Sequence, residues 1–362
     1  MTTVGIVPTR VEFPPALLPR KLRLGTRRSK LALTQSQWVA DRLTESLAAL
    51  GATVEVELVE VTTHGDATAK DNTPLATLGG TGVFVTALRD ALLRGEVDLA
   101  VHSLKDLPTG PAEGLSPVVV PLREDPRDAL VARDGLTLAE LPAGARIGTG
   151  SPRRAAQLLA LGLGHEVVGL RGNVDTRLGK VTSGELDAVV LAVAGLRRIN
   201  RAAEITELLD PLLMLPAPGQ GALAVECREA DPALREALEL VQDDDALACV
   251  LAERALLARL EAGCSAPVGA LADVVEGDDG PELSLRAMVA ALDGSVTMRR
   301  SSVVPLAPDI SGSSGADRAE RARAAGHALA EQMLAEGAAD LMSAPDSETP
   351  ARAPQHDPEG DQ

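Results

Sequence analysis

Aromatic residues are almost missing from this chain. Its 362 residues include one Trp, two Phe and no Tyr, while 45% are hydrophobic, so Leu, Val and Ala must build the cores. The sequence also lacks an uncharged apolar run of the roughly 18 residues that a membrane span needs. Residues 1–20 lack the compact apolar stretch of a secretory signal. We therefore expect no membrane span, no secretion, and a soluble cytoplasmic protein.

Cysteine is scarce as well. Cys227, Cys249 and Cys264 form an odd set with irregular spacing, which predicts neither a disulfide framework nor a zinc site. No other cluster has metal-ligand spacing, so we expect no metal. Free cysteines are mostly buried and inert. Cys264, however, lies among small residues, where an accessible loop could offer its thiol as a nucleophile or attachment point.

Positive charge is in deficit, and Lys is the rarer of the two cations. The net charge of −17 argues against general nucleic-acid binding, which needs a basic surface. Only five of the 35 basic residues are Lys, and the other thirty are Arg. Arg suits two-point contacts to carboxylates and phosphates, but genomic bias produces the same excess. Composition alone leaves both interpretations open.

Strand-like and helix-like segments alternate between residues 22 and 195. We expect strands at 22–25, 54–61, 97–102, 146–148, 167–169 and 188–192, and helices at 29–50, 84–92, 152–161 and 174–182. Strands separated by helices predict parallel sheets with helices on both faces.

Two Pro-bearing stretches, at 115–126 and 215–221, are expected to be paired crossovers between two α/β lobes. A third unit is expected from about residue 244. Its predicted elements are a helix at 246–260, strands at 270–275 and 283–291, and a helix at 316–336.

Arg residues gather where expected strands end and helices begin. The three segments are GTRRS at 25–29, TGSPRR at 149–154 and LRGNVDTR at 170–177. Ligands of open α/β sheets bind beyond the carboxyl ends of strands, and free N–H groups at helix starts attract anions. One such segment is more often a solvated helix start, but three on two lobes favour a cleft for a polyanion.

The segment VHSLKD at 101–106 ends an apolar strand with a Lys beside an Asp. Near such cations the Asp106 carboxylate would stay ionised, and it could stabilise a developing cation or relay a proton. The alternative is that Lys105 and Asp106 merely cap a loop. His102 is expected to be a packed strand-end residue, and the glycines at 79–82 favour a mobile lid over a phosphate loop.

Taken in order, the segments of this chain resemble those of the porphobilinogen deaminase family, also called hydroxymethylbilane synthases. The resemblance covers about residues 22–340. The matching segments are GTRRS (25–29), TPLATLGGTGVF (73–84), VHSLKDLP (101–108), REDPRDAL (123–130), IGTGSPRR (147–154), LRGNVDTRL (170–178), LAVAGLRR (191–198), LPAPGQGAL (215–223) and EAGCSAPVGA (261–270).

The resemblance implies an α/β fold of three domains. The first two are periplasmic-binding-protein-like α/β lobes with a cleft between them, and the third is a smaller C-terminal α+β domain. We expect a flexible leader at 1–20, domain 1 at 21–119 plus 218–240, domain 2 at 120–217, domain 3 at 241–342 and a disordered acidic tail at 343–362.

The resemblance also implies a reaction. Four porphobilinogen molecules are joined head to tail, each losing ammonia, on a dipyrromethane cofactor held by a thioether to Cys264, and a linear hydroxymethylbilane is released. Asp106 matches the catalytic carboxylate, which helps to protonate the departing amine, stabilises an azafulvene-like cation and accepts the proton lost on rearomatisation. Expected cofactor contacts are Ser103, Lys105, Thr149, Ser151, Arg153 and Arg154, and expected substrate contacts are Arg27, Ser29, Arg171, Arg177 and Gln220.

Two departures from the family pattern leave details open. Thr77 and Thr81 stand in the expected lid, where family members often carry Lys, and Ala262 and Ser265 alter the surroundings of Cys264. Two other functions compete with the transferase: a two-lobed anion-binding protein without chemistry, which has no need of Cys264, and a cofactor-loaded but inactive regulatory homologue. Low aromatic content and a charged surface predict a monomer.

Overall fold

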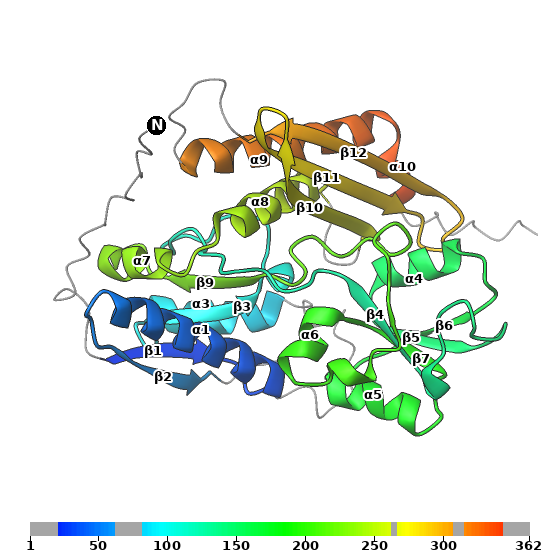
Figure 1. The fold of residues 1–362 in the computed structure, drawn as a ribbon, viewed down its shortest axis with the longest axis horizontal. Coiled ribbons are helices and arrows are strands. Elements are labelled where there is room, and N and C mark those ends of the chain that lie inside the picture. The colour runs from blue at the N-terminus through cyan, green and yellow to red at the C-terminus, as the bar shows by residue number, and fades with distance from the viewer. Residues whose placement is uncertain (1–20, 62–81, 262–265, 307–314, 343–362) are drawn as a thin grey trace, which may run out of the picture.

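The computed structural model of the chain describes residues 21–61, 82–261, 266–306 and 315–342. Within these ranges three β-sheets each carry their own helices (Figure 1). The expected leader, lid, Cys264 and acidic tail lie outside the described residues. In the part of the chain that is described, no helix is long and apolar enough to cross a membrane.

The first lobe is a four-stranded sheet in the order β2-β1-β3-β9. Its elements are β1 (Lys21–Thr26), α1 (Lys30–Ala49), β2 (Glu55–Glu60), α3 (Gly82–Leu93), β3 (Leu99–Ser103), β9 (Leu223–Cys227) and α7 (Pro232–Glu239). Helix α1 begins where predicted because the Ser29 hydroxyl accepts a hydrogen bond from the Ala32 N–H, 3.3 Å away, an N-cap contact. Its apolar stripe, with Val39 and Leu43 fully buried, packs on the sheet.

The second lobe is a five-stranded sheet in the order β6-β5-β7-β4-β8. Its elements are β4 (Asp128–Ala132), β5 (Arg146–Thr149), α4 (Pro152–Ala160), β6 (Glu166–Gly169), α5 (Val174–Thr182), β7 (Ala188–Ala192), α6 (Val193–Arg198) and β8 (Glu207–Leu208). Pro152 suits the first helical position of α4, because its missing N–H would have no partner there.

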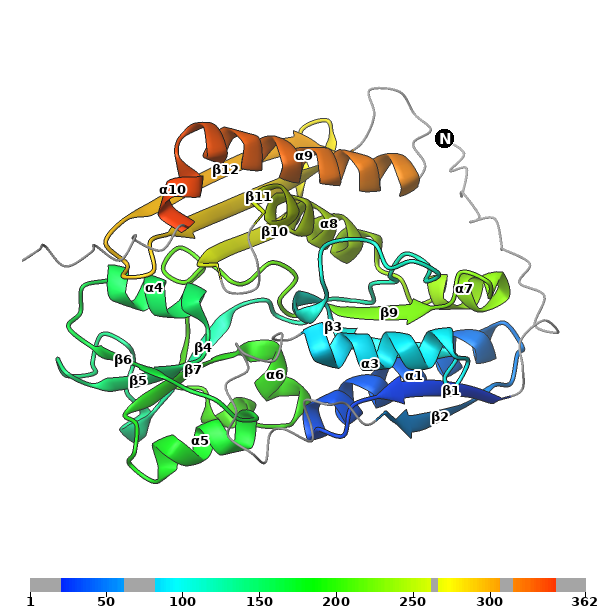
Figure 2. The same cartoon turned by 180° about the vertical axis from the view of Figure 1, so that it is seen from behind.

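The third unit is an antiparallel sheet of three strands covered by helices on one face. Its elements are α8 (Asp244–Arg259), β10 (Val268–Gly277), β11 (Gly280–Ala290), β12 (Thr297–Pro305), α9 (Gly315–Ala335) and α10 (Ala338–Met342). Figures 1 and 2 both show α8 between this sheet and the first lobe. The turn between β11 and β12 contacts α4 of the second lobe. A Cβ at Gly294 in this turn would lie 2.7 Å from the Ala156 carbonyl oxygen.

The mixed α/β class expected from the sequence is confirmed, but the expectation of wholly parallel sheets is wrong. β9 runs antiparallel to β3, and β4 runs antiparallel to β7 and β8. Both strands directly follow a passage from the other lobe. The right-handed strand–helix–strand connection that makes neighbours parallel is therefore missing at these two places.

The chain passes between the lobes twice, in the stretches that the sequence favoured. It leaves the first lobe after Val119, which still bridges Val225 of β9, and it returns shortly before Leu223. The two passages touch at Gly221, where φ is 87° and a Cβ would lie only 2.3 Å from the Glu124 carbonyl oxygen. Only glycine fits this contact. The domain boundaries given above stay a prediction.

Candidate active site

A pocket of about 120 Å³ lies where the two lobes meet. Helix α1 and the end of β3 contribute from the first lobe, and α4, α5, β7 and α6 contribute from the second. Polar and charged lining side chains are Gln35, Ser103, Lys105, Arg154, Arg177 and Arg198, and the apolar wall includes Leu31, Val174, Leu191 and Ala194. Four of the lining residues are cations, although the whole chain is acidic.

Lys105 reaches the pocket from the short 3-10 turn η3 (Leu104–Asp106) that follows β3. Its Nζ lies 3.3 Å from Oε1 of Gln220. Burial and then the charge of Arg154 lower the pKa of Lys105 to about 8, against an opposing effect of Asp106. The ammonium group therefore lies in a site where positive charge is already in excess.

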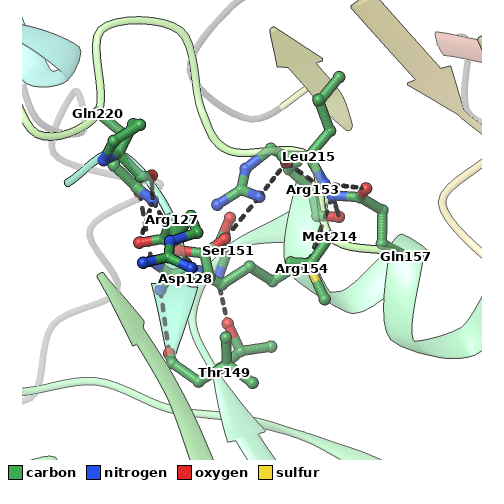
Figure 3. Close-up of polar contacts among 12 residues, drawn as sticks. Arg127, Asp128, Thr149, Ser151, Arg153, Arg154, Gln157, Met214, Leu215 and Gln220 are labelled. Carbon is green, nitrogen blue, oxygen red and sulfur yellow. Dashed lines mark hydrogen bonds and ion pairs between the residues drawn. The ribbon is translucent and has the colours of Figure 1, made fainter. Parts of the chain in front are cut away.

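Arg153 and Arg154 at the start of α4 share one buried counter-ion, Asp128 of β4 (Figure 3). Asp128 Oδ2 lies 2.9 Å from Arg153 Nη1, and Oδ1 lies 2.7 Å from Arg154 Nη2. The Gln220 amide also donates to Asp128 Oδ1, over 2.7 Å. Burial alone would raise the pKa of Asp128, but the two guanidinium groups hold it well below its usual range. One carboxylate of β4 thus joins α4 to the returning crossover.

Arg153 contacts the returning crossover and does not line the pocket. Its Nη1 donates to the Leu215 carbonyl oxygen over 2.5 Å, and Gln157 on the next turn of α4 donates to the same oxygen. Only Arg154 of the pair also lines the pocket, where its Nη2 lies 3.4 Å from Gln220 Oε1.

Arg177 of α5 and Arg198 of α6 line the opposite wall. Arg177 Nε donates to the Gly172 carbonyl over 2.8 Å, and Arg198 Nη2 donates to the Gly221 carbonyl over 2.7 Å. Among the described residues, no carboxylate forms an ion pair with either one. Burial lowers the pKa of Arg198 to about 10 and also lowers that of Arg177. Both cations are therefore half-buried, and neither has an ion-pair partner among the described carboxylates; Glu124 acts on Arg198 only through its charge.

The remaining predicted site residues divide between the pocket and its surroundings. Ser103 lines the pocket, and its hydroxyl accepts from Gln35 Nε2 over 3.1 Å. Thr149 Oγ1 accepts from the Ser151 N–H over 3.2 Å, and neither of the two lines the pocket.

Four further predicted residues also lie outside the pocket lining. Ser29 caps α1, Arg171 is exposed after β6, and Arg27 is half-buried after β1. Asp106 is half-buried at the end of the same turn as Lys105 and acts on the charge of that neighbour. The structure therefore brings together Ser103, Lys105, Arg154 and Arg177, with Gln220 bonded to two of them.

Sequence reasoning did not single out Gln35, Asp128 or Arg198. The last two lie in the quoted segments REDPRDAL and LAVAGLRR, so a signal was present but no single residue stood out. Gln35 lies on α1 about two turns after Ser29, and only its position on the pocket-facing side distinguishes it. Among the described residues no group of His, Cys, Asp and Glu is arranged to hold a metal ion.

Glu253 of α8 anchors the third unit to the floor of this site. Its carboxylate, fully buried, accepts two hydrogen bonds from Arg123 of the outgoing crossover and one from the Gly219 N–H of the returning crossover. It also accepts from the Ala272 N–H of β10 over 2.8 Å. One side chain thereby fixes both crossovers, and with them Gln220, against the third sheet.

Comparison with known families gives two matches. Residues 22–236 match the family described as "Porphobilinogen deaminase, dipyromethane cofactor binding domain", and residues 247–335 match "Porphobilinogen deaminase, C-terminal domain". Porphobilinogen deaminase 1 of Streptomyces coelicolor is 55% identical over 328 residues, covering 89% of this chain and 98% of that protein. Porphobilinogen deaminase of Mycobacterium tuberculosis is 53% identical over 326 residues, covering 89% and 98%.

Solved structures resemble the chain much less. The methionine binding protein MetQ aligns with a TM-score of 0.36 at 14% identity, over 63% of this chain and 92% of that one.

Proposed function

Because the chain belongs to the porphobilinogen deaminase family, we propose that the pocket between its lobes holds the carboxylates of the growing polypyrrole chain. The enzyme is a transferase that joins four porphobilinogen molecules head to tail, with loss of ammonia, on a covalently bound dipyrromethane primer, and releases hydroxymethylbilane. Substrate, primer and product all carry acetate and propionate groups.

The observation that carries the proposal is a pair of half-buried pocket arginines that form no ion pair with a described carboxylate. Arg177 and Arg198 line the pocket, and no described carboxylate forms an ion pair with either. A half-buried guanidinium without an ion-pair partner has lost part of its hydration, so a ligand that supplies carboxylates to it gains free energy. Each charge-assisted contact contributes roughly 1.5–3 kcal/mol. Several of them could hold an intermediate of several rings.

The residues present also fit the dipyrromethane cofactor, since its carboxylates match the cations of the pocket. Lys105 and Arg154 would bind those carboxylates, with Ser103 as a neutral hydrogen-bonding group. When bound, this cofactor supplies the pyrrole carbon to which the first substrate is added. Cys264 stays the predicted attachment residue and lies outside the described residues.

We assign the proton transfers to Asp106. In each addition the C–N bond of porphobilinogen breaks, ammonia leaves, a C–C bond forms to a pyrrole carbon, and that carbon loses a proton. The Asp106 carboxylate would accept a hydrogen bond from the protonated amine, which leaves as ammonia, would stabilise the azafulvene-like cation left behind, and would then accept the proton from the pyrrole carbon. Asp106 is half-buried on the same turn as Lys105. The proposed acid–base group and a carboxylate-binding cation therefore lie side by side in the chain.

The other predicted contacts take supporting roles in this proposal. Thr149, Ser151 and Arg153 would shape the start of α4 behind the pocket, and Arg27, Ser29 and Arg171 would contact substrate from its rim. Gln220 would hold Lys105 and Arg154 apart, because its Oε1 accepts a hydrogen bond from each of them. The cytoplasmic location and the monomeric state stay predictions from the sequence.

Asp106→Asn tests the proposal. The variant removes the acid–base group but keeps the size of the side chain, so we expect kcat to fall by at least about 100-fold while the intact mass still includes the cofactor. Asp134→Asn, at an exposed loop carboxylate of the second lobe, is the control and should retain activity. Normal turnover by Asp106→Asn would refute the assigned role.

A wild-type protein whose mass never changes with porphobilinogen would instead favour an anion-binding protein without chemistry.

A further inference from the structure

The turn that carries Asp106 is held from outside its own lobe. Arg254 of α8 donates from Nη1 to the Leu107 carbonyl oxygen over 3.1 Å and to the Leu104 carbonyl oxygen over 3.4 Å. Its Nη2 donates to the Pro108 carbonyl oxygen. One guanidinium therefore contacts the backbone on both sides of Asp106.

Packing around these bonds leaves the turn little freedom except at its polar end. Leu104 and Leu107 are buried and pack against Ala246 and Val250, one face of α8. The Leu107 N–H also closes the turn on the Leu104 carbonyl over 3.1 Å. The packed side chains of Leu104 and Leu107 and the bonds of Arg254 to their carbonyl oxygens therefore hold the backbone on both sides of Asp106.

The same helix leads toward the predicted attachment residue. Helix α8 ends at Arg259, a few residues before Cys264. Arg254 therefore connects α8, which runs toward Cys264, with the turn η3, which carries Asp106. No such link follows from the pocket itself, because Arg254 is not among its lining residues.

We propose that Arg254 is a positioning residue for the reaction, which sets the direction of the Asp106 carboxylate relative to the cofactor-bearing third unit. This inference rests on the role proposed for Asp106. A misplacement of about 1 Å in a reacting group can cost on the order of 100-fold in rate. Loss of the three carbonyl contacts should therefore lower kcat, while the cations that bind substrate stay in place and KM changes little.

The test compares Arg254→Met and Arg254→Lys with Arg259→Met in the cofactor-loaded enzyme. Arg259 lies on the same helix and pairs with Glu331 of α9, so its variant loosens α8 without touching the turn. We expect Arg254→Met to lower kcat by about tenfold to 100-fold with KM within about threefold. Arg254→Lys, which keeps a charge and three donors, should recover part of that loss.

Intact mass must show full cofactor loading in every variant, because an empty cofactor site would account for lost activity by itself. A kcat within twofold of wild type in Arg254→Met, or an equal loss in Arg259→Met, would overturn the inference. An Arg254→Met variant that fails to load leaves Arg254→Lys to decide by the same two criteria. Asp106→Asn, run in parallel, separates the two proposals: if it keeps full turnover, the role of Asp106 fails first and the positioning role fails with it.

Discussion

Two pairs of arginines flank the same pocket and differ in what neutralises them. Arg153 and Arg154 share the buried carboxylate of Asp128, whereas the partners of Arg177 and Arg198 within the described ranges are backbone carbonyls. The first pair connects α4, β4 and the returning crossover, so it maintains the arrangement of the lobes. The second pair leaves its charge available to a ligand.

An arginine-rich motif therefore does not by itself show whether its cations bind a ligand or hold the fold together. Arg153, Arg154 and Arg177 all lie in segments that begin helices after strands, and all three were expected to bind ligand. What separates them is a carboxylate that the fold brings to one pair and not to the other. Stability and binding should therefore respond in opposite ways when the two pairs are changed.

Asp128→Asn should have the largest effect on the free energy of unfolding. It leaves two buried guanidinium groups without their counter-ion, and removal of one partner from a buried ion pair costs about 3–5 kcal/mol. We expect a loss of that size in the free energy of unfolding, measured by urea denaturation of the loaded enzyme. A loss under about 1 kcal/mol would show that Asp128 is not the counter-ion we describe.

Arg177→Leu and Arg198→Leu should have the opposite pattern, with a lower kcat/KM and no loss of stability. Each removes a cation without a described carboxylate partner, so the free energy of unfolding should stay the same or rise. The lost contact of roughly 1.5–3 kcal/mol should lower kcat/KM about 10- to 150-fold. Arg197→Leu is the matched control, because Arg197 is next in sequence but pairs with Glu124 at the surface. Equal losses of kcat/KM in Arg197→Leu and Arg198→Leu would contradict the assignment.

The pH dependence of Lys105 gives a smaller effect. Because burial and Arg154 lower its pKa to about 8, Lys105 is charged below that pH and loses its charge as pH rises through it. Attraction for carboxylates should weaken correspondingly, so kcat/KM should fall above pH of about 8. In Lys105→Arg, whose group stays charged, this alkaline limb should disappear. An unchanged limb in that variant would assign it to another group.

The smallest effect is expected from a partly exposed ion pair of the second lobe, Arg133 with Asp187. Arg133 Nε lies 2.6 Å from Asp187 Oδ1, but the arginine side chain is 42% exposed. Exposed ion pairs contribute at most about 1 kcal/mol. Asp187→Asn should therefore change the free energy of unfolding by less than that and leave kcat/KM unchanged, which sets the scale against which Asp128→Asn is judged.

Much of the fold could be predicted because it follows local periodicity. The helix at 174–182 and the strand at 188–192 have the bounds expected from the sequence. Strands β4 and β9 were not anticipated, since each enters its sheet from a crossover, and pairing across that distance leaves no local pattern. β12 and α7 were also missed. β12 pairs with β11, the strand just before it, but its sequence TMRRSSVVP lacks the apolar alternation that predicts a strand.

The site was predictable as a set of segments but not as a set of roles. Arg153 and Arg177 follow similar strand ends, yet only the contact of Arg153 with Asp128, from a different strand, decides that it is paired. Gln220 reaches the same carboxylate from 92 positions away in sequence. Contacts between residues so far apart in sequence form only in the folded chain, and no local motif predicts them.

If Arg177 and Arg198, which pair with no described carboxylate, hold the growing chain, their joint removal should stop chain growth. The double variant Arg177→Leu/Arg198→Leu, loaded with cofactor, is mixed with porphobilinogen and its intact mass is recorded over time. We predict the mass of the loaded enzyme with the series of one- to four-substrate adducts absent or stalled at its first member. A full series formed at the wild-type rate would contradict the claim.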